Sequence, residues 1–171
     1  PLPDEQIAAF VPEFSAPGHY RDPEKIAAYI AAEKAAWLEK AALSPLTGRV
    51  VAIGFLCLGD ICIFTDDDET LMLKKFWMAY KTNVGIGEFY VGFNIYHFDL
   101  PFLIRRSMAL GVEIPFGILP ACKFWDNQFV DVMQSWQCGN KQERISLDNY
   151  AKFLGVGKKN GEGKDFAKLL K

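Results

Sequence analysis

The chain contains 171 residues with a formal net charge of −2, which is the size of one ordinary globular domain. Half of its residues are hydrophobic and 23% are charged, a balance that excludes intrinsic disorder and low-complexity sequence. With this net charge the molecule as a whole has no excess positive charge that would attract nucleic acid. The net charge does not exclude a local cluster of basic residues. No apolar run approaches the roughly 20 residues that span a bilayer. We therefore expect residues 1–171 to form a single domain with no membrane segment.

The four cysteines predict free thiols. They contain no C-x-x-C pair and have no histidine at zinc-ligand spacing, so we expect buried thiols rather than a disulfide or metal framework. The cysteines are Cys57, Cys62, Cys122 and Cys138. The chain opens on Pro1 without a basic-then-apolar leader, so we expect a piece of a longer product without a signal peptide. These features favour a cytoplasmic protein.

The N-terminal part predicts an irregular segment followed by one long helix. Prolines recur through residues 1–22, and each disfavours helix in the residue before it. Asp22 can cap a helix that starts at Pro23, and apolar residues then recur on one face to about Leu43.

The central part predicts a hairpin and a second helix. Two β-rich runs, 49–58 and 61–65, are separated by Gly59-Asp60, which is a hairpin signal. The acidic residues 66–69 then precede an apolar-periodic segment, where a helix N-terminus favours negative charge. The rival hypothesis, a metal cluster, is weaker because adjacent carboxylates at a helix start usually cap it.

The C-terminal half alternates strands and helices. We expect strands at 89–93 and 129–133, and helices at 99–110 and 146–154, the last one ending at Gly155. Together with the hairpin, this order predicts an α/β domain in which a mixed sheet is covered by helices.

The segment 92–103, GFNIYHFDLPFL, carries the most chemical information in the chain. It follows a predicted strand, and in α/β sheets the functional side chains gather at the carboxyl ends of strands. Asn94 and Asp99 are therefore candidate site residues. The alternative from the residues alone is that Asn94 ends the strand and Asp99 caps the next helix.

Asn94 with Phe98-Asp99, followed by Pro101-Phe102-Leu103 and Arg106, resembles the second exonuclease motif of DEDD-type 3′–5′ exonucleases. The resemblance is greatest to enzymes similar to the proofreading domain of family B DNA polymerases. The hairpin and the stretch from Asp131 to Val156 fit the spacing of stand-alone members, so the likeness covers nearly the whole chain.

This resemblance implies an RNase H-like fold and a metal-dependent hydrolase in DNA repair or replication. It would release nucleotides from the 3′ ends of nucleic acid, single-stranded DNA above all. Two Mg²⁺ or Mn²⁺ ions about 4 Å apart would activate water and stabilise the leaving oxygen. By resemblance, Asp99 is a metal ligand and a catalytic residue, while Asn94 and Phe98 position the terminal nucleotide.

The first and third motifs of the family are not in the sequence. An Asp-x-Glu is expected just before Pro1 and a Tyr-x-x-x-Asp just after Lys171, so the chain supplies one of four expected acids. Asp4 and Glu5 are poor substitutes, because adjacent side chains diverge in an extended segment. We therefore expect activity from the intact parent protein and not from these residues alone.

Three further residues are candidates near the site. Residues 152–171 hold six lysines against two acids, and Lys158 within them is predicted to contact substrate phosphates, with a solvated surface loop as the alternative. Arg106 has the same two interpretations, phosphate contact or exposed helix surface. Asp131 is either an acid near the site or a helix cap.

Two other functions remain open. One is a catalytically inactive RNase H-like module that binds nucleic acid or protein. The other is an endonuclease with a related fold, which would cleave closed circular substrates.

Overall fold

The computed structural model describes residues 1–57, 60–83, 89–115, 118 and 129–158. Within these ranges the elements alternate between helices and short strands, which confirms the mixed α/β class. None of the helices in these ranges combines the length and hydropathy needed to cross a bilayer.

The N-terminal segment contains two short helices that the proline spacing did not predict. These are α1 at Asp4–Ile7 and a 3₁₀ turn, η1, at Ala8–Phe10. Pro3 stands just before α1 with φ −54°, and Asp4 and Glu5 occupy its first turn, where negative charge is favourable. Ile7 is only 2% exposed. The prediction of an irregular lead-in was therefore wrong for residues 4–10.

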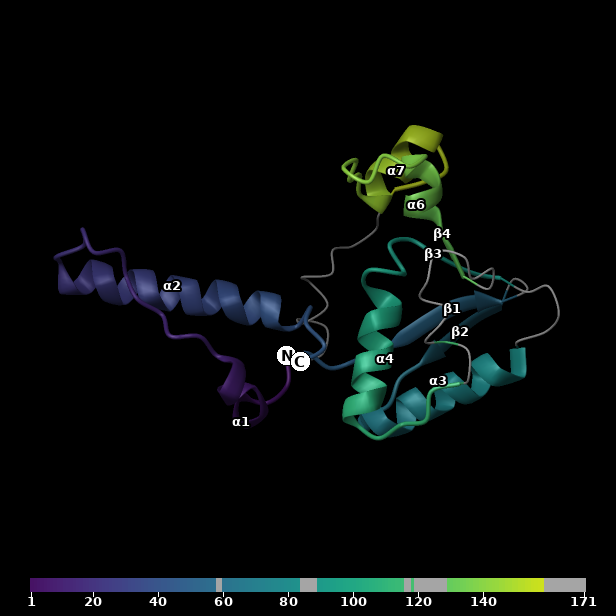
Figure 1. Ribbon diagram of the computed structural model, residues 1–171, viewed down its shortest axis with the longest axis horizontal. Helices are drawn as coiled ribbons and strands as arrows, with labels where there is room; N and C mark the ends of the chain where they lie inside the picture. Colours follow the sequence, from purple (N-terminus) through teal and green to yellow (C-terminus); the bar gives the residue numbers. More distant parts are fainter. Residues whose placement is uncertain (58–59, 84–88, 116–117, 119–128, 159–171) are drawn as a thin grey trace.

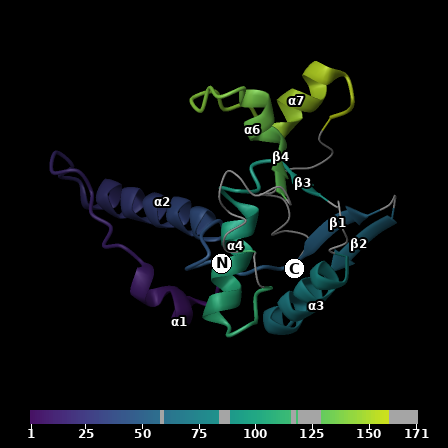
Figure 2. The same cartoon turned by 45° about the vertical axis from the view of Figure 1, so that its right-hand side comes forward.

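Helix α2 spans Pro23–Ala41, two residues shorter than predicted. The side chain of Asp22 accepts a 3.0 Å hydrogen bond from the backbone N–H of Glu24, which confirms the predicted cap. Its apolar side contacts the lead-in, through the Phe14–Trp37 ring pair among others. Figures 1 and 2 show α1 and α2 together on one side of the molecule, away from the hairpin.

The predicted hairpin is present. Strand β1 (Ile53–Cys57) pairs antiparallel with β2 (Asp60–Phe64), and Phe55 lies opposite Cys62. One face of the hairpin packs on α3, where the Phe64 and Phe76 rings meet edge to face with centroids 6.1 Å apart.

Helix α3 spans Glu69–Asn83 and is capped by the acids before it. The Asp68 carboxylate accepts hydrogen bonds from the backbone N–H groups of Thr70 and Leu71. Asp66 accepts a 3.0 Å hydrogen bond from the backbone N–H of Asp68 through Oδ1 and pairs with Lys75 through Oδ2. The hydrogen bonds to the Asp68 carboxylate confirm the predicted capping by the acidic residues. In the described part of the chain no three His, Cys, Asp or Glu side chains gather to hold a metal ion.

The described residues of the C-terminal half contain two more strands and three helices. Strand β3 (Tyr90–Gly92) pairs in parallel with β4 (Phe129–Asp131). Helices α4 (Asp99–Ala109) and α7 (Leu147–Leu154) lie where the sequence predicts them. The predicted strand 129–133 was too long, because the chain turns at Asp131 into helix α6 (Val132–Gln137).

The four strands form two separate sheets, β1–β2 and β3–β4, among the described residues. The single mixed sheet expected for an RNase H-like fold is not evident there. One core nevertheless joins the parts, and α3 contributes much of it through Met72, Leu73, Trp77 and Tyr80. Burial of these large apolar side chains is the main favourable term in such a domain.

Two cysteines have described side chains, and both are free thiols. Cys62 is half-buried, but Cys138 is exposed, so the expectation of buried thiols was wrong for Cys138. The side chain of Cys57 and the whole of Cys122 lie outside the described residues.

Candidate active site

The turn between β3 and α4 is built around Asn94. This residue has φ +60°, in the left-handed region that asparagine tolerates better than most side chains. Its carbonyl accepts hydrogen bonds from the backbone N–H groups of His97 and Phe98 at 3.2 and 3.0 Å. The turn reverses the chain within four residues and places Asp99 at the start of α4.

Asp99 does not cap its helix. The N-cap position belongs to Phe98, whose side chain makes no capping hydrogen bond. Asp99 is the first helical residue, and the backbone N–H that its carboxylate engages is its own. The structural alternative for Asp99, a helix-capping role, is therefore wrong.

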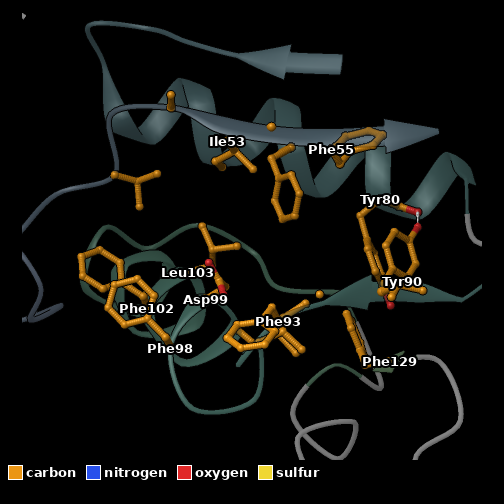
Figure 3. Close-up of a pocket in the computed structure, with 18 of the residues that line it drawn as sticks. Ile53, Phe55, Tyr80, Tyr90, Phe93, Phe98, Asp99, Phe102, Leu103 and Phe129 are labelled. Atoms are coloured by element: carbon orange, nitrogen blue, oxygen red, sulfur yellow. Dashed lines mark hydrogen bonds between the residues drawn. The ribbon is translucent and has the colours of Figure 1, made fainter. Parts of the chain in front are cut away.

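A cavity of about 980 Å³ lies beside Asp99. Its walls come from β1, α3, β3 and α4, and Figure 3 shows Asp99 on the α4 side with Ile53 and Phe55 opposite. The lining is mainly apolar and aromatic, and Arg49 and Asp99 are its only charged residues within the described ranges. A largely apolar pocket with a few polar groups is typical of a ligand site.

The surroundings of Asp99 raise the pKa of its carboxyl above the ordinary value. Desolvation by neighbouring groups is the main cause, and the negative charge of Asp131 adds to it. A backbone hydrogen bond partly opposes the shift. An acid with a perturbed pKa beside a cavity is a candidate for a functional role.

Asn94 and Phe98 precede Asp99 in the same turn, where the Phe98 N–H donates to the Asn94 carbonyl, but Asn94 is not among the residues that line the cavity. The Phe98 ring is 40% exposed and packs on Phe102 with centroids 5.8 Å apart. Phe98 also lines the cavity. An aromatic face that is partly open and next to a carboxylate is suited to stack on a base or sugar.

Arg106 lies away from the cavity and is not available to a substrate. Its guanidinium donates to both carboxylate oxygens of Glu69, at 2.9 and 2.6 Å, and the two side chains are 6% and 9% exposed. The predicted phosphate contact of Arg106 is wrong, and so is the alternative of an exposed surface residue. Both interpretations failed because the sequence does not indicate that Glu69, at the start of α3, accepts hydrogen bonds from Arg106.

Lys158 is exposed and follows α7. Its neighbour in the predicted basic patch, Lys152, forms an ion pair with Asp148 on the same helix. The other four lysines of the patch lie outside the described residues. The phosphate contact of Lys158 stays a prediction.

Asp131 combines the two interpretations that the sequence left open. Its Oδ1 accepts a 3.0 Å hydrogen bond from the backbone N–H of Met133 and so caps α6. The same oxygen accepts from the backbone N–H of Asn94 at 2.8 Å. The second contact joins residues 37 apart in the chain, so no local pattern could have indicated it.

Comparison with known proteins bears directly on this site. Residues 56–153 match the family described as DNA polymerase family B, exonuclease domain, and this is more than half of the chain. The chain belongs to this family. No curated protein and no solved structure matches it significantly.

The part of the chain that matches the family B exonuclease domain contains the whole β3–α4 turn and Asp131. The predicted family is thereby confirmed. Lys158 and helix α2 lie outside the matched residues, so the family match says nothing about them.

Proposed function

We propose that the intact protein is a 3′–5′ exonuclease that hydrolyses phosphodiester bonds at the 3′ ends of nucleic acid, with single-stranded DNA as its main substrate. The observation that supports this most is the position of Asp99. In a chain of the family B exonuclease domain family, this acid has no capping role, lies beside a cavity, and has a raised pKa.

Three residues of the β3–α4 turn carry the proposed roles. The Asp99 carboxylate lies at the reacting end, next to the scissile phosphate. Phe98 packs against the terminal base or sugar with its exposed ring face. Asn94 donates or accepts a hydrogen bond at the terminal nucleotide. Lys158 is proposed to contact a phosphate farther from the end.

Mg²⁺ or Mn²⁺ is the expected cofactor, since the family is typically metal-dependent. A pair of such ions needs several oxygen ligands, whereas Asp99 is the only carboxylate among the described residues that line the cavity. These residues therefore do not form a metal centre by themselves, and we assign no chemical step to the ions. The further carboxylates are expected in the motifs that the resemblance places before Pro1 and after Lys171.

The same proposal accounts for the two separate sheets. Strands β1 and β3 line one cavity, and within the described ranges β1 pairs with β2 and β3 with β4 only. Unpaired strand edges readily accept a further strand. We propose that a leading strand with the Asp-x-Glu motif lies between β1 and β3, where it would fill the apolar part of the cavity, complete an RNase H-like sheet and bring its acids toward Asp99 at the cavity's edge.

The proposed function is tested by the polarity and metal dependence of digestion. The intact protein is incubated with a 5′-labelled single-stranded oligonucleotide and Mg²⁺ or Mn²⁺. We expect a ladder that shortens one nucleotide at a time from the 3′ end, and no reaction with EDTA. Closed circular single-stranded DNA should remain intact, because it has no 3′ end. Cleavage of the circle would indicate an endonuclease instead.

A second candidate is a module that binds nucleic acid without hydrolysis. It is favoured by one observation, the single carboxylate among the described residues around the cavity. In the same assay this alternative predicts retention of the labelled oligonucleotide on the protein with no shortening at any metal concentration.

A further inference from the structure

Asp131 is a deeply buried residue at the end of β4, and its carboxylate accepts hydrogen bonds from the turn between β3 and α4. The residue is 3% exposed, and its two oxygens accept three backbone N–H groups. Oδ1 accepts from Asn94 at 2.8 Å and Met133 at 3.0 Å, while Oδ2 accepts from Tyr96 at 3.4 Å. No lysine or arginine of the described chain forms an ion pair with Asp131, so backbone amides satisfy the carboxylate.

Capping of α6 requires only one of these hydrogen bonds. The contact with the Met133 N–H is the ordinary N-cap interaction. The contacts with Asn94 and Tyr96 reach across from β4 to the β3–α4 turn. They hold a turn whose first residue has a left-handed backbone, a conformation that persists in a non-glycine residue when its surroundings fix it.

The turn is also held by its own backbone and by the Tyr96 hydroxyl, which donates to the Phe129 carbonyl of β4 at 2.6 Å. The Asn94 carbonyl accepts from His97 and Phe98, and the Ile95 carbonyl accepts from Leu100. The amides of Asn94 and Tyr96 point the other way, toward Asp131. Through these two amides, the carboxylate of Asp131 ties the backbone of the turn to the end of β4.

We propose that Asp131 is a positioning residue of the exonuclease site, which sets the orientation of Asn94 and Asp99 through the backbone amides of Asn94 and Tyr96. This inference rests on the proposed function and adds a residue to it. A displacement of about 1 Å in a reacting group can cost roughly 100-fold in rate, so loss of these contacts should lower kcat much more than it raises KM.

The test compares Asp131→Ala with Ser146→Ala in the intact protein. Ser146 caps the neighbouring helix α7 by accepting from the Asn149 N–H, so its replacement removes a helix cap without touching the turn. Both variants are expected to lower the Tm. Only Asp131→Ala should lower kcat, by about tenfold or more, with KM within about threefold. It alone should also speed hydrogen exchange at the Asn94 amide.

Asp131→Asn is the conservative variant and keeps the test informative if Asp131→Ala does not fold. It retains the Oδ1 acceptor for Asn94 and Met133, loses the charge, and replaces the Oδ2 acceptor of the longer Tyr96 contact with an NH2 donor. We expect a kcat within about threefold of wild type and slow exchange at the Asn94 amide. A large loss of kcat with the Asn94 and Tyr96 amides both still protected would overturn the proposal, because the charge and not the hydrogen bonds would then matter.

Two other results separate this inference from the proposed function. If Asp131→Ala has wild-type kcat and an unchanged Asn94 amide, with only the Tm lowered, Asp131 is a helix cap and the inference is wrong. If the wild-type protein releases no nucleotides, the proposed function is wrong. Exchange at the Asn94 amide then still decides whether Asp131 holds the turn.

Discussion

Arg106 and Glu69 form a bidentate ion pair that joins the last turn of α4 to the start of α3. The guanidinium also donates to the Pro45 carbonyl, and Glu69 accepts from the Val50 N–H at 2.8 Å. The pair therefore ties the segment before β1 to two helices that form the core. A residue that matches the exonuclease motif has a structural role here.

This pair gives a stability prediction. Arg106→Met should lower the free energy of unfolding by about 3–5 kcal/mol, because it leaves the buried Glu69 carboxylate without its partner. Arg105→Met, at the exposed neighbouring position, should change it by less than about 0.5 kcal/mol. Urea denaturation measures both values. A loss below about 1 kcal/mol for Arg106→Met would mean that the pair does not hold the helices together.

The raised pKa of Asp99 gives a pH-dependent prediction for the metal-free protein. The folded state holds the Asp99 proton more tightly than the unfolded state, so stability from this group is present at low pH and lost as pH rises through the folded pKa. Asp99→Asn should therefore raise the Tm at pH 7, and this gain should shrink toward pH 4 and below.

Asp66 provides a control of opposite sign. The hydrogen bond with Lys75 lowers the pKa of Asp66, so its stabilising contribution is present above the unfolded pKa and is lost as pH falls. Asp66→Asn should lower the Tm at pH 7. Thermal melts of both variants in EDTA between pH 3 and 8 test whether the two substitutions change the Tm in opposite directions. A lower Tm for Asp99→Asn than for wild type at pH 7 would contradict the account of Asp99.

Gly92 lets the Ile95 side chain pack directly against the backbone of β3, as the turn between β3 and α4 requires. A Cβ at Gly92 would lie 2.9 Å from Ile95 Cβ and Cδ1. Because Ile95 Cβ is attached to the backbone, the turn itself must shift. Gly92→Ala should destabilise the protein by about 1–3 kcal/mol and slow nucleotide release by about 100-fold.

Gly54→Ala is the matched control for this substitution. Gly54 also lies in a strand, but a Cβ there has no neighbour nearer than 4.0 Å. We expect near-wild-type rates from this variant. Equal rates for the two variants would show that the turn tolerates displacement and that its geometry does not govern activity.

Phe98→Ala should weaken binding of the 3′ end. Removing a stacking ring costs about 1–3 kcal/mol per base, so KM for a single-stranded oligonucleotide should rise by about fivefold to 100-fold. The Tm should change little, because the ring is 40% exposed. Phe153→Ala removes a ring that is 76% exposed on α7 and should leave KM unchanged. A KM unaffected by Phe98→Ala would remove this residue from the proposed site.

Local signals were sufficient to predict much of the fold. The hairpin around Gly59-Asp60 and the helix starts at Pro23 and Asp99 are encoded within a few neighbouring residues, and the structure has them where expected. Helix α6 was missed because it has only six residues and its C-cap, Cys138, adopts the left-handed conformation without being a glycine. The extent of the domain and the cytoplasmic location stay predictions.

The site was predictable only in part, since its remaining features depend on contacts between distant residues. Asn94, Phe98 and Asp99 share one turn, so their proximity follows from the sequence. The pairs Glu69–Arg106 and Asn94–Asp131 each join residues 37 apart, and no periodicity or motif indicates such partners. The first pair makes Arg106 unavailable to a substrate phosphate, contrary to the prediction. The second pair is the basis for proposing Asp131 as a positioning residue.

The role of Asp99 is tested most directly by the single-turnover rate of nucleotide release from a 3′-labelled single strand with Mg²⁺. We expect Asp99→Asn to lower this rate by about 100-fold or more, whereas Asp67→Asn, at an exposed acid before α3, should retain it. Equal rates for Asp99→Asn and the wild-type protein would contradict the assignment of Asp99 and with it the proposed site.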